Sequence, residues 1–341
     1  KRTIHMLTRL ILQNYRNYPY SQWIFDQSLV FLCGDNGTGK TNILEAISLL
    51  NVPKGLRSVD VKDLGLYDHD NQLHQDWTIF YDLAGSAASI ESAAGKKKIR
   101  LHQKPAFQKH LREYVRIFWV APENDRLFAG TPAERRNFIH QLIEISNPEF
   151  ETLHSQYMHC IQERSQILRM PHPDAAWLDR LEANISDLAA QIYTIRNDFI
   201  NTLNGWIKQL NHFHYHRFEM KDELFDDLAA QIRSNRNYDQ MRGGCKAGPH
   251  KSDLVGYRYD MPLQLCSNGQ QCIGLFSVLL GLVKQHSQTQ PVIFLIDEIF
   301  SHLDITHQEL LLQELKAMPT VQTFITLPHV AVFPEAQVIL L

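Results

Sequence analysis

The sequence predicts an α/β fold whose sheet-containing lobe is discontinuous, with a mostly helical lobe inserted between its two halves. Apolar runs typical of buried strands lie at 29–33 and 292–296, near opposite ends of the chain. Between them, apolar residues recur at steps of three or four, which is the spacing of an amphipathic helix. We therefore assign 1–125 and 247–341 to the α/β lobe and 126–246 to the helical insert.

The N-terminal part of the chain has the sequence pattern of strands alternating with short helices. Strands are predicted near 7–12, 29–33, 77–83 and 116–120. A helix is predicted from about Asn42. Two segments, 85–98 and 234–248, are rich in Gly, Ala, Ser, Asn and charge, so both are predicted to be loops.

Local signals also predict the helices of the insert. Thr131 and Glu134, three residues apart, have the pattern of a helix-capping box. A long helix is predicted over 177–210, and its antiparallel partner over 150–170 is joined to it through the turn-prone MPHPDA. These helices form either a packed bundle, which we favour, or a projecting coiled coil.

Composition and charge exclude several classes of protein. With 44% hydrophobic and 21% charged residues the chain is typical of a globular protein, and no stretch is apolar over the roughly 20 residues that a membrane helix needs. The five cysteines are odd in number and include no CxxC pair, so we expect reduced thiols, no structural zinc and a cytoplasmic location. The N-terminal residues alternate in polarity, which favours a strand over a signal peptide. Because the net charge is -3, DNA binding would need local basic patches.

A glycine-rich loop carries the most specific signal for function. The string GDNGTGKT follows the apolar run 29–33 and precedes a helical segment, which is the context of a P-loop and not of an incidental turn. Backbone N–H groups would surround the β-phosphate of ATP, Lys40 would neutralise the β and γ oxygens, and the Thr41 hydroxyl would hold Mg²⁺. The predicted nucleotide-binding residues are Gly34, Asp35, Asn36, Gly37, Thr38, Gly39, Lys40 and Thr41.

Two acids follow the second apolar run. Asp297 and Glu298 come directly after 292–296, as expected when a buried parallel strand delivers carboxylates to its carboxyl end. Asp297 would position Mg²⁺ through a water, and Glu298 would polarise the water that attacks the γ-phosphate. The alternative is an ordinary strand end with a helix-capping acid.

A third motif precedes a long apolar helix. Ser267, Gly269 and Gln270 lie in CSNGQQC, where a hydroxyl and free backbone N–H groups at a helix N-terminus can form an anion site. An ordinary N-cap is the alternative. The segment SHLD, which ends at Asp304, follows the acidic pair.

The order of these motifs resembles that of ABC-type ATPases: P-loop, signature, acidic strand and D-loop, with Asp304 at the D-loop position. In that superfamily the signature of one subunit covers the γ-phosphate held by the P-loop of the other. One chain carries a single copy of each element, so the resemblance implies an ATP-dependent homodimer.

Within this superfamily the chain is similar to the RecF family along most of its length. The motifs that carry the resemblance are LTRLILQNYRNY, the extended P-loop region followed by GLRS, VAPENDRLFAGTPAERRNFIHQLI with its paired arginines, and AGPHKSDL. The resemblance implies a DNA-binding protein of recombinational repair and replication-fork maintenance that acts at gapped DNA. It also implies slow, DNA-stimulated ATP hydrolysis, Mg²⁺ as cofactor, and the partners RecR, RecO and, indirectly, RecA.

Four residues have weaker assignments. Arg16 resembles an arginine that reaches the nucleotide phosphates in related proteins, with an ion-pairing role as the alternative. Arg57 in GLRS would sense DNA or the partner subunit, or lie on a solvated surface. His329 is the candidate switch histidine, and no Q-loop glutamine is identified. Cys272 stands where the family usually has a basic residue.

The basic run KKKIR at 96–100 is a candidate DNA contact, since lysines bind phosphates without reading sequence; a solvated loop is the alternative. Three other ATPases were considered. An SMC-type mechanical protein needs helical arms far longer than this insert. A transporter nucleotide-binding subunit would carry a smaller helical lobe. A RecF-like defence ATPase would carry an appended nuclease domain, which we do not expect here.

Overall fold

The computed structural model describes residues 6–52, 54–67, 72–93, 95–223, 225–329 and 335–341. The chain forms two compact units, and each is described by itself. Unit 1 comprises Lys1–Asp125, Leu210–Phe213 and Leu275–Leu341, and unit 2 comprises Arg126–Gln209 and His214–Gly274. Among the described residues, no helix combines the length and apolar character needed to cross a membrane.

Unit 1 contains a six-stranded antiparallel sheet with the order β2-β1-β4-β5-β6-β7. Its strands are β1 Leu7–Tyr15, β2 Tyr18–Ile24, β4 Trp77–Leu83, β5 Ser86–Ala93, β6 Lys96–Leu101 and β7 Lys104–Pro105. In β4 the residues Trp77, Ile79, Tyr81 and Leu83 are buried and alternate with less buried ones. One face of this sheet therefore packs into the core, as the alternating sequence pattern predicts.

A second, parallel sheet in unit 1 has the order β14-β3-β13-β12-β8. Its strands are β3 Leu29–Cys33, β8 Arg116–Val120, β12 Val292–Ile296, β13 Val321–Leu327 and β14 Gln337–Leu340. Every residue of β3 and β12 is buried, which explains their uninterrupted apolar runs. Because the strands are parallel, the segments that follow β3, β8, β12 and β13 emerge at one edge of the sheet.

The helical elements of unit 1 connect these strands. They are α1 Lys40–Ser48, η1 Val61–Asp63, α2 Gln108–Tyr114, η2 Pro122–Asn124, η5 Ile299–His302 and α9 Ile305–Lys316. The helix α8, Asn268–His286, crosses the division, since unit 1 resumes at Leu275.

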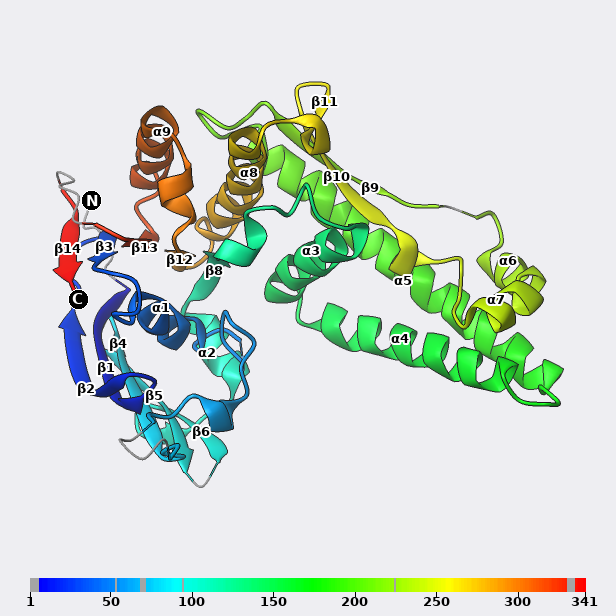
Figure 1. The fold of residues 1–341 in the computed structure, drawn as a ribbon, viewed down its shortest axis with the longest axis horizontal. Helices are drawn as coiled ribbons and strands as arrows, with labels where there is room; N and C mark the ends of the chain where they lie inside the picture. Colours follow the sequence, from blue (N-terminus) through cyan, green and yellow to red (C-terminus); the bar gives the residue numbers. More distant parts are fainter. Residues whose placement is uncertain (1–5, 53, 68–71, 94, 224, 330–334) are drawn as a thin grey trace. The chain divides into compact units, whose positions relative to one another are not determined.

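Unit 2 is mostly helical. Its helices are α3 Pro132–Ser146, α4 Glu149–Leu168, α5 Ala175–Ile207, α6 Leu228–Ser234 and α7 Arg236–Arg242, with the short turns η3 Pro249–Lys251 and η4 Leu263–Leu265. The helices α4 and α5 lie side by side as a hairpin (Figure 1). Thr131 caps α3 through the predicted reciprocal box: the Glu134 N–H donates to the Thr131 hydroxyl at 3.3 Å, and the Thr131 N–H donates to the Glu134 carboxylate at 2.6 Å.

A three-stranded antiparallel sheet, β11-β10-β9, completes unit 2. Its strands are β9 His216–Lys221, β10 Asp253–Arg258 and β11 Met261–Pro262. Arg135 forms a bidentate pair with Asp253 at 2.8 Å for both contacts, and Arg136 donates to the Ser252 carbonyl at 2.7 Å. The paired arginines noted in the sequence thus anchor the segment that carries the GPH motif.

Two expectations about local structure are corrected. The segment 85–98 is not a loop, because β5 and the first half of β6 pair as a hairpin there. The segment 234–248 contains α7. The compact units group 247–274 with the helices of unit 2, where β10 pairs with β9. The division of the chain into domains at 1–125, 126–246 and 247–341 stays a prediction.

Candidate nucleotide-binding site

The P-loop connects β3 to α1 and curls around its own lysine. Lys40 is 5% exposed. Its ammonium donates to the carbonyls of Gly34 at 2.7 Å and Asp35 at 2.8 Å. The Thr38 hydroxyl donates to the same Asp35 carbonyl at 3.0 Å. These contacts close the loop around the Lys40 ammonium.

Gly39 has to be a glycine for two reasons. Its φ of 105° lies in the left-handed region, which side-chain-bearing residues rarely adopt. A Cβ at this position would also lie 2.4 Å from the Tyr18 hydroxyl and 2.6 Å from the Asn17 amide nitrogen. Gly39 thus allows the turn between β1 and β2 to approach the P-loop closely.

That turn supports the P-loop from outside, which the sequence analysis missed. The Asn17 amide donates to the Thr38 carbonyl at 3.2 Å, and the Tyr18 hydroxyl donates to it at 3.3 Å. The Asn42 amide donates in turn to Asn17 at 2.8 Å. The signal was the NYRNY string, of which only the arginine was assigned a role.

The acidic strand end meets the P-loop through shared hydrogen bonds. Asp297 is 3% exposed, and its Oδ1 accepts from the Thr41 hydroxyl at 3.1 Å and from the Thr326 hydroxyl at 2.8 Å. Burial raises the pKa of the Asp297 carboxyl above its usual value, and the hydrogen bonds from Thr326 and Thr41 partly oppose this rise. The proposed magnesium ligands Thr41 and Asp297 thus lie together.

Thr326 is a further residue that the sequence analysis missed. Its hydroxyl donates to Asp297 and accepts from the backbone N–H of Glu298 at 2.8 Å. The available signal was a threonine at the carboxyl end of the apolar run TFITL, one strand away from the acids. One hydroxyl therefore links both acids to β13.

Glu298 lies outside the protein core, with its backbone in an uncommon conformation. Its φ is 57°, its side chain is exposed, and it precedes the turn η5. Left-handed backbone at a residue other than glycine is sparsely populated and is concentrated at functional sites. This geometry leaves the carboxylate free of the contacts that bury Asp297.

Arg16 forms an ion pair within the protein, as the alternative interpretation of its role predicts. Its guanidinium makes two contacts of 2.7 Å with the fully buried carboxylate of Glu45 and donates to the Asp63 carbonyl at 3.0 Å. The Tyr15 hydroxyl donates to the same carboxylate at 3.1 Å. All three guanidinium nitrogens are thus engaged within unit 1, and contact of Arg16 with nucleotide stays a prediction.

Arg57 lies beside the P-loop helix. It is exposed, and its guanidinium donates to the Asn42 side chain at 3.0 Å. Its charge contributes a small lowering of the Asp297 pKa, against the dominant effect of burial. The location agrees with a role near the nucleotide as well as with a solvated surface, so sensing of DNA or of a partner stays a prediction.

The signature residues cap α8. The Gln270 N–H donates to the Ser267 hydroxyl at 3.4 Å, and the Ser267 N–H donates to the Gln270 side chain at 3.2 Å. Ser267 and Gly269 are exposed, and nothing lies within 4 Å of a Cβ built on Gly269. Cys272 is fully buried. The N-cap is observed, and a role in covering ATP stays a prediction.

Asp304 and His329 follow β12 and β13 respectively. Asp304 caps α9: it accepts from the His307 N–H at 2.9 Å and contacts the His307 ring at 2.7 Å. The backbone hydrogen bond from His307 lowers the pKa of Asp304. His329 is exposed at the sheet edge shared with the P-loop strand, and its role as a switch stays a prediction.

The end of β8 brings one more acid to this edge. The Asp297 N–H donates to the Val120 carbonyl at 2.9 Å, so β8 ends beside the acidic pair. Glu123 follows within η2 and is exposed. In the sequence Glu123 stands out only as part of a family string, because the pairing of β8 with β12 is not visible there.

Comparison with known proteins identifies the family of the chain. A family model described as RecF/RecN/SMC N terminal domain matches residues 6–340. The DNA replication and repair protein RecF of Rhizobium rhizogenes is 29% identical over 329 residues, which cover 87% of this chain and 86% of that protein. The RecF of Caulobacter vibrioides is 29% identical over 354 residues, which cover 94% and 91%.

Solved structures show the same fold. The recombination mediator protein RecF with ATPrS has a TM-score of 0.78 at 18% identity, covering 97% of this chain and 94% of that one. The Smc head bound to the C-winged helix domain of ScpA has a TM-score of 0.52 at 13% identity. The resemblance to RecF predicted from the sequence is confirmed, and the chain belongs to the RecF/RecN/SMC N-terminal domain family.

Proposed function

We propose that this protein is an ATP-dependent DNA-binding protein of recombinational repair and replication-fork maintenance. Two copies would close around ATP on gapped DNA and reopen on slow hydrolysis. The relatives named RecF are DNA replication and repair proteins, and one solved relative is a recombination mediator in the RecFOR pathway. By this likeness the partners would be RecR, RecO and, indirectly, RecA.

The observation that carries the proposal is the hydrogen-bonded chain from Thr41 through Asp297 and Thr326 to the backbone of Glu298. It joins the phosphate loop to the two acids at one sheet edge. Lys40 would release the Gly34 and Asp35 carbonyls and transfer its ammonium to the β- and γ-phosphates. Glu298, exposed beside this edge, would hold and polarise the attacking water.

The residues present fit a magnesium ion. The Thr41 hydroxyl and the Asp297 carboxylate offer hard oxygen atoms 3.1 Å apart, and phosphate and water oxygens would supply the remaining ligands. Among the described residues, no three His, Cys, Asp or Glu side chains cluster closely enough to hold a metal by themselves. Bound Mg²⁺ would neutralise charge on the phosphates, and Asp297 and Thr41 would orient it.

The signature would act in a second copy of the chain. Ser267 and Gly269 are exposed at the N-terminus of α8, where a hydroxyl, backbone N–H groups and the positive end of the helix favour an anion. We propose that they cover the γ-phosphate bound to Lys40 of the other copy. ATP would then hold the dimer together.

Sizing chromatography with ATP or ADP, and with or without gapped DNA, tests this mechanism. We expect ATP alone to convert a monomer to a dimer, Lys40→Ala to prevent the conversion, and Glu298→Gln to trap the ATP-bound dimer. Glu309→Gln, an exposed acid on α9, is the matched control and should behave as wild type. Dimers that form equally without ATP in both site variants would refute the gating mechanism.

A further inference from the structure

A cavity of about 380 Å³ lies in unit 2 between α4 and the segment 243–251. The cations Arg169 and Lys251 line it, together with the polar side chains of Gln162, Ser165 and Gln166. The lining includes no carboxylate. A polar cavity with two cations and no acid favours an anionic ligand.

One wall of the cavity is a glycine loop held by the backbone carbonyl and the buried carboxylate of Asp239. The backbone N–H groups of Gly243 and Gly244 donate to the Asp239 carbonyl at 2.8 and 3.2 Å. The Lys246 N–H donates to the Asp239 carboxylate at 3.0 Å. A Cβ on Gly243, whose φ is 74°, would lie 3.0 Å from the Arg169 guanidinium. The glycines therefore let Arg169 lie against the loop.

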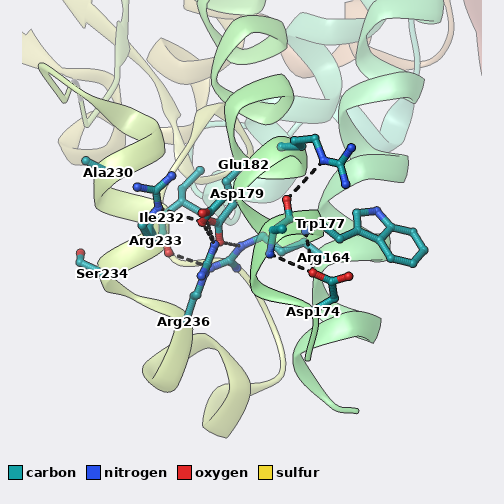
Figure 2. Close-up of polar contacts among 12 residues, drawn as sticks. Arg164, Asp174, Trp177, Asp179, Glu182, Ala230, Ile232, Arg233, Ser234 and Arg236 are labelled. Carbon is teal, nitrogen blue, oxygen red and sulfur yellow. Dashed lines mark hydrogen bonds and ion pairs between the residues drawn. The ribbon is translucent and has the colours of Figure 1, made fainter. Parts of the chain in front are cut away.

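A buried charge network fixes Asp239 in turn. Arg164 donates to Asp239 at 2.8 Å and to Glu182 at 2.8 Å, and all three side chains are buried. Arg236 contacts Glu182 and Asp179 at 2.6 Å each. Figure 2 shows Arg164, Glu182, Asp179 and Arg236 converging from α4, α5 and α7. The loop is thus attached to the helical hairpin by paired charges, and not merely folded over it.

The other end of the loop is held by neutral groups. The His250 ring contacts the Tyr157 hydroxyl at 2.6 Å and the Cys245 carbonyl at 2.9 Å. Burial lowers the pKa of His250 to about 4, so the ring is neutral at pH 7. The positive charge at the cavity therefore comes from Arg169 and Lys251.

More cations continue outward along the same segment. Arg242 and Lys246 are exposed, and both lie near the Tyr238 ring, with the Lys246 ammonium 5.1 Å from its centroid. Tyr238 is 45% exposed. The cations of the cavity and of this segment thus belong to one short stretch of chain and the neighbouring end of α4.

The basic run at 96–100 is less available for an anion. It lies in β6, where Arg100 is paired with Glu91 at 3.4 Å. Lys97 donates to Gln108 at 3.0 Å, and burial lowers its pKa to about 8. Two of its four cations are therefore already engaged within the protein.

Resting on the function proposed above, we propose that the cavity and the adjoining segment bind the phosphate backbone of DNA. Lys251 and Arg169 would hold one phosphate in the cavity, and Lys246 and Arg242 would contact the next ones. Contacts of this kind are independent of base sequence and weaken with salt.

The chemistry favours DNA over other anions. A free nucleotide would need an apolar slot for its base, whereas Ile161 is the one aliphatic side chain in the lining. An acidic peptide would be neutralised by the cations but would make no use of the exposed Tyr238 ring. That ring suits stacking of an unpaired base next to a phosphate contact.

Fluorescence anisotropy with gapped DNA over a salt series, with ATP present, tests the proposal in the full chain. We expect Lys246→Gln/Lys251→Gln to weaken binding at least about tenfold and to reduce the salt slope by about 2. Lys96→Gln/Lys98→Gln, which removes two exposed lysines of β6, is the matched control and should retain most of the affinity. ATP-dependent dimerisation of both variants shows that folding and the nucleotide site are intact.

Several outcomes would overturn the proposal. If Lys246→Gln/Lys251→Gln kept the wild-type affinity and salt slope while Lys96→Gln/Lys98→Gln bound DNA more weakly, the DNA contact would lie in unit 1. The proposed function would then still stand. If Lys246→Gln/Lys251→Gln retained DNA binding but lost binding of a poly-glutamate probe, the cavity would be assigned to an acidic protein segment. Absence of DNA binding by the wild-type protein would overturn both this inference and the proposed function.

Discussion

Two buried aspartates, Asp297 in unit 1 and Asp239 in unit 2, stand in opposite electrostatic situations. Asp297 is 3% exposed and accepts hydrogen bonds from two neutral hydroxyls, with no ion pair among the described residues. Asp239 is 2% exposed and is paired with Arg164. A buried carboxylate without a cation is costly unless a ligand supplies one, whereas a paired carboxylate serves the scaffold. Whether a buried aspartate is paired with a protein cation therefore distinguishes a structural site from a metal site.

The largest expected effect is a loss of stability when the paired aspartate, Asp239, is replaced. Asp239→Ala should destabilise the protein by about 3–5 kcal/mol, because it leaves Arg164 buried without its full complement of acids. Urea unfolding of the apo protein measures this change. Asp227→Ala removes the exposed N-cap of α6 instead and should cost about 1 kcal/mol. Equal losses in the two variants would contradict the structural role of Asp239.

An intermediate effect is expected at the hydroxyl that joins the two acids. Thr326→Val should lower kcat for ATP about 10- to 100-fold, because Asp297 and the backbone of Glu298 lose their shared partner. KM should change little, since the P-loop contacts remain. Steady-state ATPase assays measure both parameters, and Thr326→Ser should restore activity. A variant that raises KM alone would assign Thr326 to substrate binding and not to positioning of the acids.

The smallest effect is expected at the unpaired aspartate. Asp297→Asn should raise the apo melting temperature by about 2 °C at pH 7, because it removes a buried charge and keeps the acceptor oxygen. Since burial raises the folded-state pKa of Asp297, the wild type is relatively most stable below the usual aspartate pKa. That advantage is lost as pH rises through the raised pKa.

The difference in melting temperature between the Asp297→Asn variant and the wild-type protein should therefore widen with rising pH and then level off. Thermal melts from pH 4 to pH 8 provide this measurement. With ATP and Mg²⁺ the order should reverse, because the wild-type carboxylate gains a cation that the amide does not hold. A variant that remains the more stable form with ATP and Mg²⁺ would contradict a metal-binding role for Asp297.

The sequence by itself determined the features that depend on short stretches of chain. The P-loop, the strands at 29–33 and 292–296, the capping box at Thr131 and the hairpin of α4 and α5 follow from residue spacing, turn chemistry and caps, which act over a few residues. Family strings then identified the relationship to RecF.

Only the tertiary structure decided which distant residues share a contact. Thr326 holds the acids because β13 pairs with β12, and Asn17 reaches the P-loop because β1 and β2 turn beside it. The glycine-rich, charged stretches were wrongly predicted to be loops. The strands β5 and β6 pair with each other there and β5 also pairs with β4, while 236–242 forms a helix held by buried charges. Sheet pairing and burial join residues far apart in the chain, so no local pattern encodes them.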